Sequence, residues 1–216
     1  RDESIMLCKS ETKKTGNYER LVRLLISDRQ YAEAERWIKE GIRTIKNKWP
    51  GIAAGLRNQL REIRHLQKNW PAIAALQVED FIRHPSRQAF IDCKKAADRL
   101  QVWAEVREHL LLYLEKGELP WKQNNWPLPD SGLEAPKKSS TDQYPMVSEL
   151  IDLAILEKRP DQVLHWYDNL QENKYGWYGV NLDEIAAAIE AHAPDRAVAI
   201  WKHKAERLID QVKPKA

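Results

Sequence analysis

Apolar residues recur at intervals of three and four along nearly the whole 216-residue chain. This spacing places them on one face of an α-helix, whereas a half-buried strand needs a sustained apolar and polar alternation that no stretch shows. We therefore expect an all-α protein. With 8 glycines, 11 prolines, 43% hydrophobic and 31% charged residues, and no apolar run near the roughly 18 residues of a membrane span, the composition is that of a water-soluble globular chain.

Residues 18–45 contain two helical patterns separated by a polar turn. The apolar or small positions are Tyr18, Leu21, Val22 and Leu25 in the first pattern and Tyr31, Ala34, Ile38 and Gly41 in the second. Ala34 and Gly41 would let two helix axes approach closely, so we predict a helical hairpin. The spacing resembles the tetratricopeptide repeat, although Val22 stands where that repeat usually has glycine.

A second signal is a period of 34 residues, which separates Pro160-Asp161 from Pro194-Asp195. Proline suits a first helical position because its missing N–H would be unpaired there, and the following carboxylate faces the positive end of the helix dipole. Thirty-four residues is the tetratricopeptide length. With first helices at 146–157 and 182–191, the C-terminal third is predicted to form two tandem hairpins.

A third signal is an internal echo, in which Trp49-Pro50 recurs 21 residues later as Trp70-Pro71. Each proline is predicted to begin a helix, and each tryptophan to pack at that helix entry instead of forming a ligand cage. Another hairpin is predicted over residues 86–115. Together the hairpins predict tetratricopeptide-like repeats stacked in an α-α superhelix, or solenoid.

Prolines, serines and lysines concentrate between residues 117 and 143, where no helix is expected. This break predicts an N-terminal helical-hairpin array over 1–117, a loop or linker over 118–142 and C-terminal tandem hairpins over 143–216, with one continuous array as the alternative. Trp121 and Trp126 are unusual in a free linker. We therefore expect part of this loop to strap across a neighbouring helix.

Four segments resemble the C-terminal helical region of bacterial SWIM zinc-finger proteins: residues 49–57, the Trp70-Pro71 echo, residues 114–121 and residues 194–216. The resemblance covers nearly the whole chain. It implies a longer protein with further helices and with an upstream Cys-x-Cys and Cys-x-His zinc module for DNA or protein binding. Cys8 and Cys93 stand alone, so no zinc ligand of that family, and no other metal or cofactor site, is predicted in this chain.

Catalytic motifs are weak. The six histidines show no local pair at a metal-ligand spacing such as His-x-x-x-His. Cys93 with a distant histidine could supply a nucleophile and a base, but it follows Phe90 on an apolar helix face, where free cysteine usually acts as a small hydrophobe. Gly176 and Gly179 are predicted to form a turn between hairpins. We therefore expect no enzyme activity.

The clearest candidate binding site is a line of four cations, which we call the basic stripe: Arg57, Arg61, Arg64 and Lys68. Their steps of four, three and four place them side by side on the helix expected over 50–67. Glu62 is the only acidic residue between Gly41 and Trp70. The basic stripe could bind phosphates or an acidic peptide, and the alternative is a solvated face whose long stems cover apolar surface.

The overall charge does not select a partner, since 35 Lys and Arg against 32 Asp and Glu leave only +3. Two cysteines and no signal peptide favour the cytoplasm. Stacked hairpins present an extended surface and no reaction chamber, so we expect a non-enzymatic protein-protein interaction scaffold that binds a protein or peptide segment. The alternative is a nucleic-acid-binding helical module, for DNA or RNA, that assists the upstream zinc finger. We expect no membrane and no small-molecule substrate as a partner.

Overall fold

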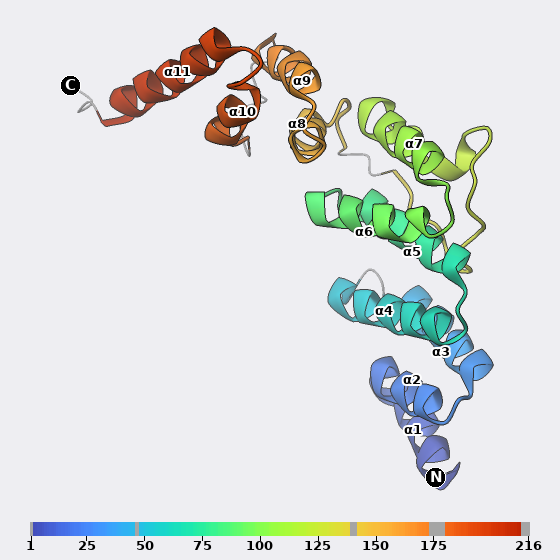
Figure 1. Cartoon of the computed structure of the whole chain (residues 1–216). Helices are drawn as coiled ribbons and strands as arrows, with labels where there is room; N and C mark the ends of the chain where they lie inside the picture. Colours follow the sequence, from blue (N-terminus) through green and yellow to red (C-terminus); the bar gives the residue numbers. More distant parts are fainter. Residues whose placement is uncertain (1, 46–47, 139–141, 173–179, 213–216) are drawn as a thin grey trace. The chain divides into compact units, whose positions relative to one another are not determined.

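The computed structural model describes residues 2–45, 48–138, 142–172 and 180–212 (Figure 1). Within these ranges it contains helices and no strand, which confirms the all-α prediction. The helices in chain order are α1 (Asp2–Thr15), α2 (Tyr18–Ser27), α3 (Tyr31–Ile45), α4 (Pro50–Leu66), α5 (Trp70–Arg83), α6 (Arg87–Asp98), α7 (Trp103–Lys116), the 3₁₀ helix η1 (Pro120–Lys122), α8 (Val147–Leu156), α9 (Pro160–Glu172), α10 (Leu182–Ile189) and α11 (Pro194–Val212).

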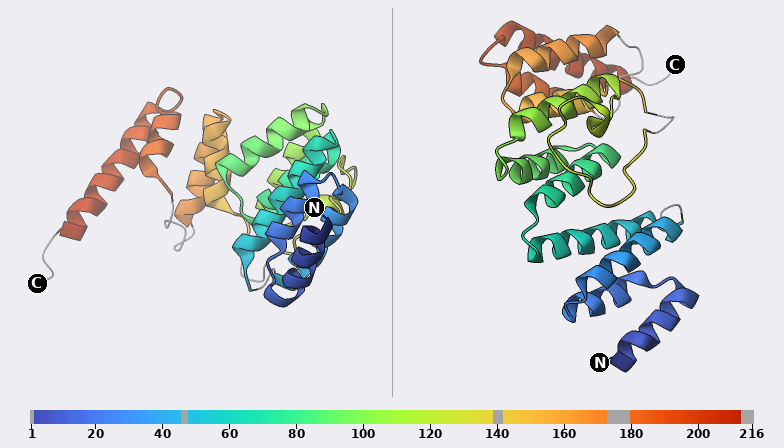
Figure 2. Two further views of the ribbon diagram at one scale, coloured as in Figure 1. Left: turned by 90° about the horizontal axis from the view of Figure 1, so that it is seen from below. Right: turned by 90° about the vertical axis from the view of Figure 1, so that its right-hand side faces the viewer.

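The predicted hairpins are present as neighbouring pairs: α2 packs on α3, α6 on α7, α8 on α9 and α10 on α11 (Figures 1 and 2). Pro50, Pro160 and Pro194 each begin a helix, as predicted. The echo helix differs slightly, because α5 begins at Trp70 and not at Pro71. Helix α1 was not predicted, since its largely polar sequence buries few apolar side chains.

One turn recurs after α2, α4, α6 and α8. At each of these helix ends, a non-glycine residue has a positive φ: Arg29 (58°), Lys68 (54°), Gln101 (59°) and Lys158 (55°). The amide of the next residue donates to the carbonyl five positions back, as Gln30 does to Leu25 at 2.9 Å. This is the Schellman ending, which satisfies helix carbonyls and reverses the chain within three residues. The repeated turn is a local cause of the repeated pairing.

We call the helix before each of these turns a first helix and the helix after it a second helix, and we extend the terms to α10 and α11. In every hairpin the two helices follow one another directly in sequence. First helices of successive hairpins also contact one another: α2 contacts α4, α6 contacts α8, and α8 contacts α10. The second helices α3, α7 and α9 contact the first helix that follows. Within each unit, the first helices that contact one another therefore lie side by side.

The chain divides into two compact units. Unit 1 comprises Arg1–Glu79 with Leu128–Ala135, and unit 2 comprises Asp80–Pro127 with Pro136–Ala216. These limits differ from the predicted ones at 117 and 143, because the chain passes to unit 2 within α5 and because residues 128–135 return to unit 1. Whether residues 1–117 and 143–216 are separate domains stays a prediction.

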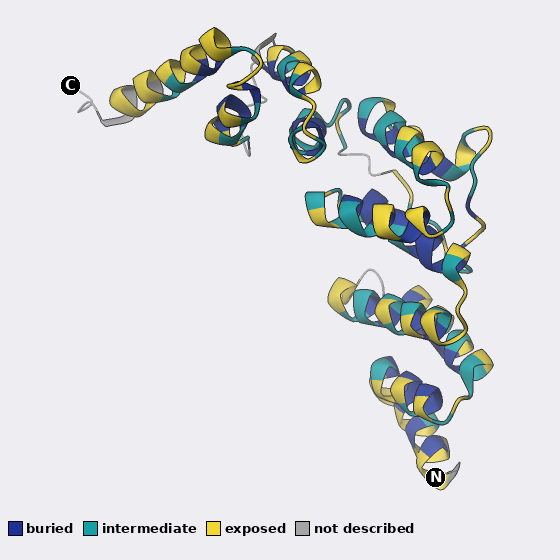
Figure 3. Ribbon diagram, viewed as in Figure 1, coloured by how far each residue is buried: buried dark blue, intermediate teal, exposed yellow. Residues whose placement is uncertain are grey.

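The core of unit 1 lies where α2, α3 and α4 meet, with the apolar side of each helix buried against its neighbours (Figure 3). Gly41 of α3 sits at a close helix crossing. A Cβ atom there would lie 2.7 Å from Cδ1 of Leu56 and 2.8 Å from Cγ of Tyr18. Both neighbours are buried, so neither can move aside cheaply. The predicted role of Gly41 in close helix packing is confirmed.

Residues 128–135 form what we call the strap of unit 1. Leu133 joins the unit 1 core, and the hydroxyl of Ser131 donates to the carboxylate of Glu79 at 2.5 Å. Ser131 and Glu79 are both buried, so each polar group satisfies the other out of water. The expected strapping by part of the loop is confirmed: Ser131 and Leu133 anchor it in unit 1, and the ring of Trp126 contacts His109 of α7 in unit 2.

Two further expectations have different outcomes. Trp49 was predicted to pack at the entry of its helix, but its side chain is 61% exposed, so this prediction is wrong. Proline already fixes the first turn of α4 there, and the helix start needs no staple. The predicted turn at Gly176 and Gly179 lies outside the described residues. Within the described ranges, none of the helices combines the length and apolar character that crossing a membrane requires.

Candidate functional site

The three arginines of the basic stripe lie on α4, beside the buried side chains of Leu56, Leu60 and Ile63, and Lys68 follows the helix. Its third member, Arg64, pairs with Glu35 of α3: Nη1 donates to Oε1, and Nη2 donates to Oε2 at 2.9 Å. Both side chains are largely shielded, at 13% and 19% exposure. A bidentate pair of this kind is geometrically specific. Arg64 therefore ties α4 to α3 and is not a free cation.

The other stripe members differ in their surroundings. Arg61 donates from Nη1 to Oδ1 of Asn58 at 3.0 Å, and Arg57 and Arg61 each make further interactions within the protein. Lys68 is exposed and occupies the positive-φ position that ends α4. The structure thus places the three arginines on α4, as expected, and engages them internally, whereas Lys68 lies in the turn after the helix and not on it. Partner binding by the basic stripe stays a prediction.

Both cysteines are buried. Cys93 is buried on α6 beside the buried side chains of Phe90 and Ala97, as the apolar pattern predicted. In the part of the chain that the structure describes, no group of three or more His, Cys, Asp or Glu side chains is arranged to hold a metal ion.

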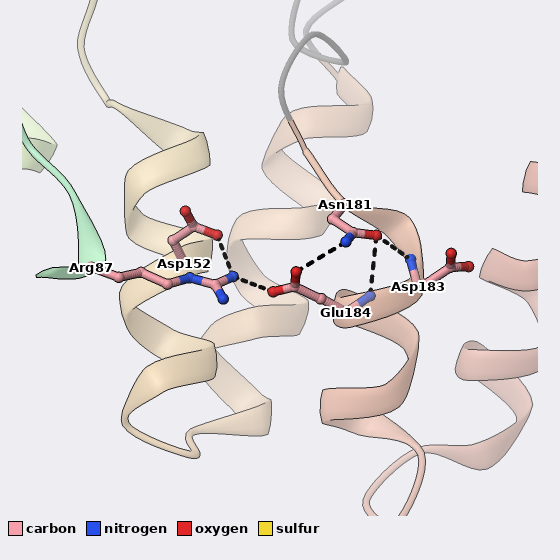
Figure 4. Close-up of polar contacts among 5 residues, drawn as sticks. All are labelled: Arg87, Asp152, Asn181, Asp183 and Glu184. Carbon is pink, nitrogen blue, oxygen red and sulfur yellow. Dashed lines mark hydrogen bonds and ion pairs between the residues drawn. The ribbon is translucent and has the colours of Figure 1, made fainter.

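A polar constellation that the sequence did not reveal lies on the first helices of unit 2 (Figure 4). We call it the Arg87 cluster: Arg87 at the start of α6, Asp152 of α8 and Glu184 of α10. Nη2 of Arg87 donates to Oδ1 of Asp152 at 2.6 Å and lies 2.5 Å from Oε2 of Glu184. One guanidinium thus connects three successive first helices.

Local helix starts position two members of the cluster. Ser86 caps α6, because its hydroxyl accepts a hydrogen bond from the backbone amide of Ala89. This cap places Arg87 in the first helical turn. Asn181 caps α10 by accepting the amides of Asp183 and Glu184, and its own Nδ2 donates to Oε1 of Glu184 at 2.9 Å (Figure 4). The Glu184 carboxylate is therefore held from both sides.

The electrostatics follow from this geometry. Partial burial disfavours the charged guanidinium of Arg87, but the hydrogen bonds to Asp152 and Glu184 and the negative charges of these two groups together outweigh it and raise its pKa. The hydrogen bond from Arg87 lowers the pKa of Glu184 below its usual range, against a smaller opposing effect of burial. By formal charge, one guanidinium against two carboxylates gives the cluster one net negative charge.

A hollow of about 280 Å³ opens beside the cluster, between the start of α6 and α8. Phe81, Pro85 and Leu153 supply apolar wall, and hydroxyl and charged side chains supply the rest. The polar lining consists of Ser86, Arg87, Ser148, Glu149 and Asp152. The volume lies just below the 300–1,000 Å³ typical of small-molecule sites, which fits one long side chain better than a cofactor.

A larger and more open hollow, of about 630 Å³, lies between α7 and the loop after it. Its charged lining balances two glutamates, Glu108 and Glu118, against two lysines, Lys122 and Lys138. Nδ1 of His109 is hydrogen-bonded to Oε1 of Gln123, whose Nε2 donates to the carbonyl of Glu118 at 2.7 Å. These contacts fold the loop onto α7. The balanced charges select no class of ligand, so we favour the smaller hollow.

Sequence reasoning missed the cluster because Arg87 and Asp152 are 65 residues apart. One local signal was available. The predicted first helices at 146–157 and 182–191 begin with Glu149 and Asp152 and with Asp183 and Glu184. A scan of charge on these predicted ranges would have found six carboxylates and no lysine or arginine. Four of the six carboxylates lie within α8 and α10.

A scan of protein-family models, a search of curated proteins and a search of solved structures each find no match to this chain. The function of the chain therefore has to follow from the chemistry of the site itself.

Proposed function

We propose that this chain is a non-enzymatic scaffold of tetratricopeptide-like hairpins, stacked as a solenoid, whose first helices bind an extended protein segment. The sequence resemblance extends the proposal, since it makes the chain the helical region of a SWIM zinc-finger protein. The observation that carries the proposal is the contact of α6 with α8 and of α8 with α10, with a hollow between the first two.

Physical reasons support this function. Neighbouring first helices present a long surface whose form is fixed by nearest-neighbour packing, and such surfaces suit extended segments. Polar groups converge there from helices far apart in sequence, as in the Arg87 cluster. The buried Cys93 has a packing role that needs no reaction to explain it.

The nucleic-acid module is the weaker alternative. It depends on the basic stripe, in which Arg64 is already neutralised by Glu35. Phosphate binding gains free energy because protein cations that neutralise phosphates release the counterions condensed on the nucleic acid. An arginine that is already paired within the protein contributes less to this release. We therefore place the protein segment first.

Selection from a displayed library of random 12-residue peptides on the immobilised chain tests the proposal. Enriched peptides are then titrated against two variants with matched added bulk. Ser148→Trp fills the hollow at the second residue of first helix α8, and Ala104→Trp adds the same ring at the second residue of second helix α7. We expect Ser148→Trp to weaken binding at least about tenfold and Ala104→Trp to change it less than about twofold.

Contrary outcomes are clear. Failure to enrich any peptide, or equal losses in the two variants, would contradict binding on the first helices. Retention of DNA or RNA, with an affinity that falls linearly in the logarithm of the salt concentration, would support the nucleic-acid module instead.

A further inference from the structure

We propose that the bound segment is basic, and that a lysine or arginine side chain of the partner enters the hollow between α6 and α8. This inference rests on the proposed function, because it names the chemistry of the segment that binds the same surface. It follows from the charge of the first helices of unit 2, from one uncommitted carboxylate and from the lining of the hollow.

The first helices of unit 2 carry an excess of negative charge where α8 and α10 meet. Their four carboxylates are Glu149, Asp152, Asp183 and Glu184. Two cations reach them from neighbouring helices: Arg87 pairs with Asp152 and Glu184, and Lys204 of α11 pairs with Asp183. Two net negative charges remain on this surface. A basic segment is attracted to it, and a polyanion is repelled.

Glu149 is the carboxylate left for a partner. It makes no ion pair or side-chain hydrogen bond with the residues that the structure describes, unlike the other three acidic groups. It also lines the hollow, one helical turn before Asp152. A cation placed between these two carboxylates would donate charge-assisted hydrogen bonds to both of them.

The rest of the lining matches a long basic side chain. Lysine and arginine have an apolar stem and a charged end. Phe81, Pro85 and Leu153 offer apolar wall for the stem, and the hydroxyls of Ser86 and Ser148 can accept from the charged end. A purely aliphatic side chain would leave Glu149 without a partner, and an acidic one would meet like charge. The hollow thus selects for lysine or arginine.

Three fluorescent 12-residue peptides test this inference with the whole chain. The first alternates alanine with lysine, and the others replace every lysine with glutamine or with glutamate. Fluorescence anisotropy is expected to give an affinity for the lysine peptide at least about tenfold above that for the glutamine peptide, and no binding of the glutamate peptide.

A matched pair of variants locates the binding. Glu149→Gln removes a first-turn carboxylate from first helix α8, and Glu105→Gln removes a first-turn carboxylate from second helix α7. Both lose the same favourable interaction with the helix dipole, so their effects on folding are comparable. We expect Glu149→Gln to weaken binding of the lysine peptide about three- to fivefold and Glu105→Gln to leave it unchanged.

The outcomes separate the two proposals. Equal affinity for the lysine and glutamine peptides, or equal effects of the two variants, would overturn the basic partner, while a first-helix site for uncharged library peptides would leave the proposed function standing. The absence of any bound peptide would end both proposals. Sedimentation that shows dimers lost in Glu149→Gln would make a second copy the occupant and would overturn the basic segment as well.

Discussion

Unit 1 and unit 2 arrange their helices in the same order of contact, yet they use charge in opposite ways. In unit 1, first helix α4 carries three arginines and one glutamate, and Arg64 is engaged with Glu35 of α3. In unit 2, first helices α8 and α10 carry only acidic charges, and Glu149 is left without a partner among the described residues. The same arrangement of helices thus yields a basic surface on which Arg64 is neutralised by Glu35 and an acidic surface on which Glu149 has no partner among the described residues.

Charged residues in a sequence are therefore a poor guide to binding until their ion-pair partners within the fold are known. The basic stripe was the more conspicuous signal, with four cations in one line. Arg64 contributes to stability instead, by joining a second helix to the next first helix. Arg107 and Glu157 do the same in unit 2, with Nε and Nη2 donating to the two carboxylate oxygens at 2.6 and 2.5 Å.

The largest expected effect tests the close packing of unit 1. Gly41→Ala would force a Cβ atom against Leu56 and Tyr18, and we expect it to destabilise the protein by about 2–3 kcal/mol in urea unfolding. Gly51→Ala is the control, because a Cβ atom there meets nothing within 4 Å, and we expect a gain of up to about 0.5 kcal/mol. A neutral Gly41→Ala would show that the crossing is looser than described.

The next effect compares the paired arginines of the two units. Arg64→Met and Arg107→Met each leave a shielded carboxylate without its bidentate partner, and we expect each to cost about 1–2 kcal/mol. Lys68→Met, at the exposed end of the basic stripe, should cost less than about 0.5 kcal/mol. Equal stability of Arg64→Met and Lys68→Met would show that Glu35 does not hold Arg64, which would then be available to bind a partner.

A smaller effect tests whether the two units share their turn. Arg29→Gly in unit 1 and Gln101→Gly in unit 2 relieve the positive φ of the Schellman ending, and we expect each to stabilise by about 0.5–1 kcal/mol. Arg23→Gly, within α2, should instead cost about 1 kcal/mol. Thermal unfolding of the three variants measures the difference. A loss of stability in only one of the turn variants would show that the turns are not equivalent.

The smallest effect is on pH dependence. Hydrogen bonding and charge from Lys9 lower the pKa of Glu33, in unit 1, and Arg87 does the same for Glu184, in unit 2. A lowered folded-state pKa stabilises the protein above the ordinary value of 4.5, and this stabilisation is lost as the pH falls below it. Glu33→Gln should therefore flatten the decline of stability between about pH 5 and 3, and Glu184→Gln, which removes a more exposed group, should flatten it less. Identical pH profiles for both variants and the unsubstituted chain would contradict these pairings.

Much of the fold could be predicted because its causes are local. Pro160 and Pro194 correctly predicted two helix starts, and the small residue Gly41 correctly predicted a close helix crossing from the sequence alone. The Schellman endings were missed, because arginine, lysine and glutamine are not the usual residues at a positive φ.

The candidate site could not be predicted, because its cause is not local. Asp152 and Glu184 meet Arg87 only when three first helices lie next to one another, and no spacing in the sequence shows that meeting. The strap could not be predicted for the same reason, since Ser131 donates its hydrogen bond to Glu79, which lies 52 residues earlier in the chain. Ion pairs between distant helices depend on packing that helical periodicity does not specify.

The central claim is that the first helices of unit 2 form the binding face, and amide hydrogen exchange tests it most directly. The chain is measured alone and with the lysine peptide at saturation, and the change in protection is compared helix by helix. We predict slower exchange in α6, α8 and α10 and no change in α7, α9 and α11. Protection confined to the second helices, or no change anywhere at saturation, would contradict the account.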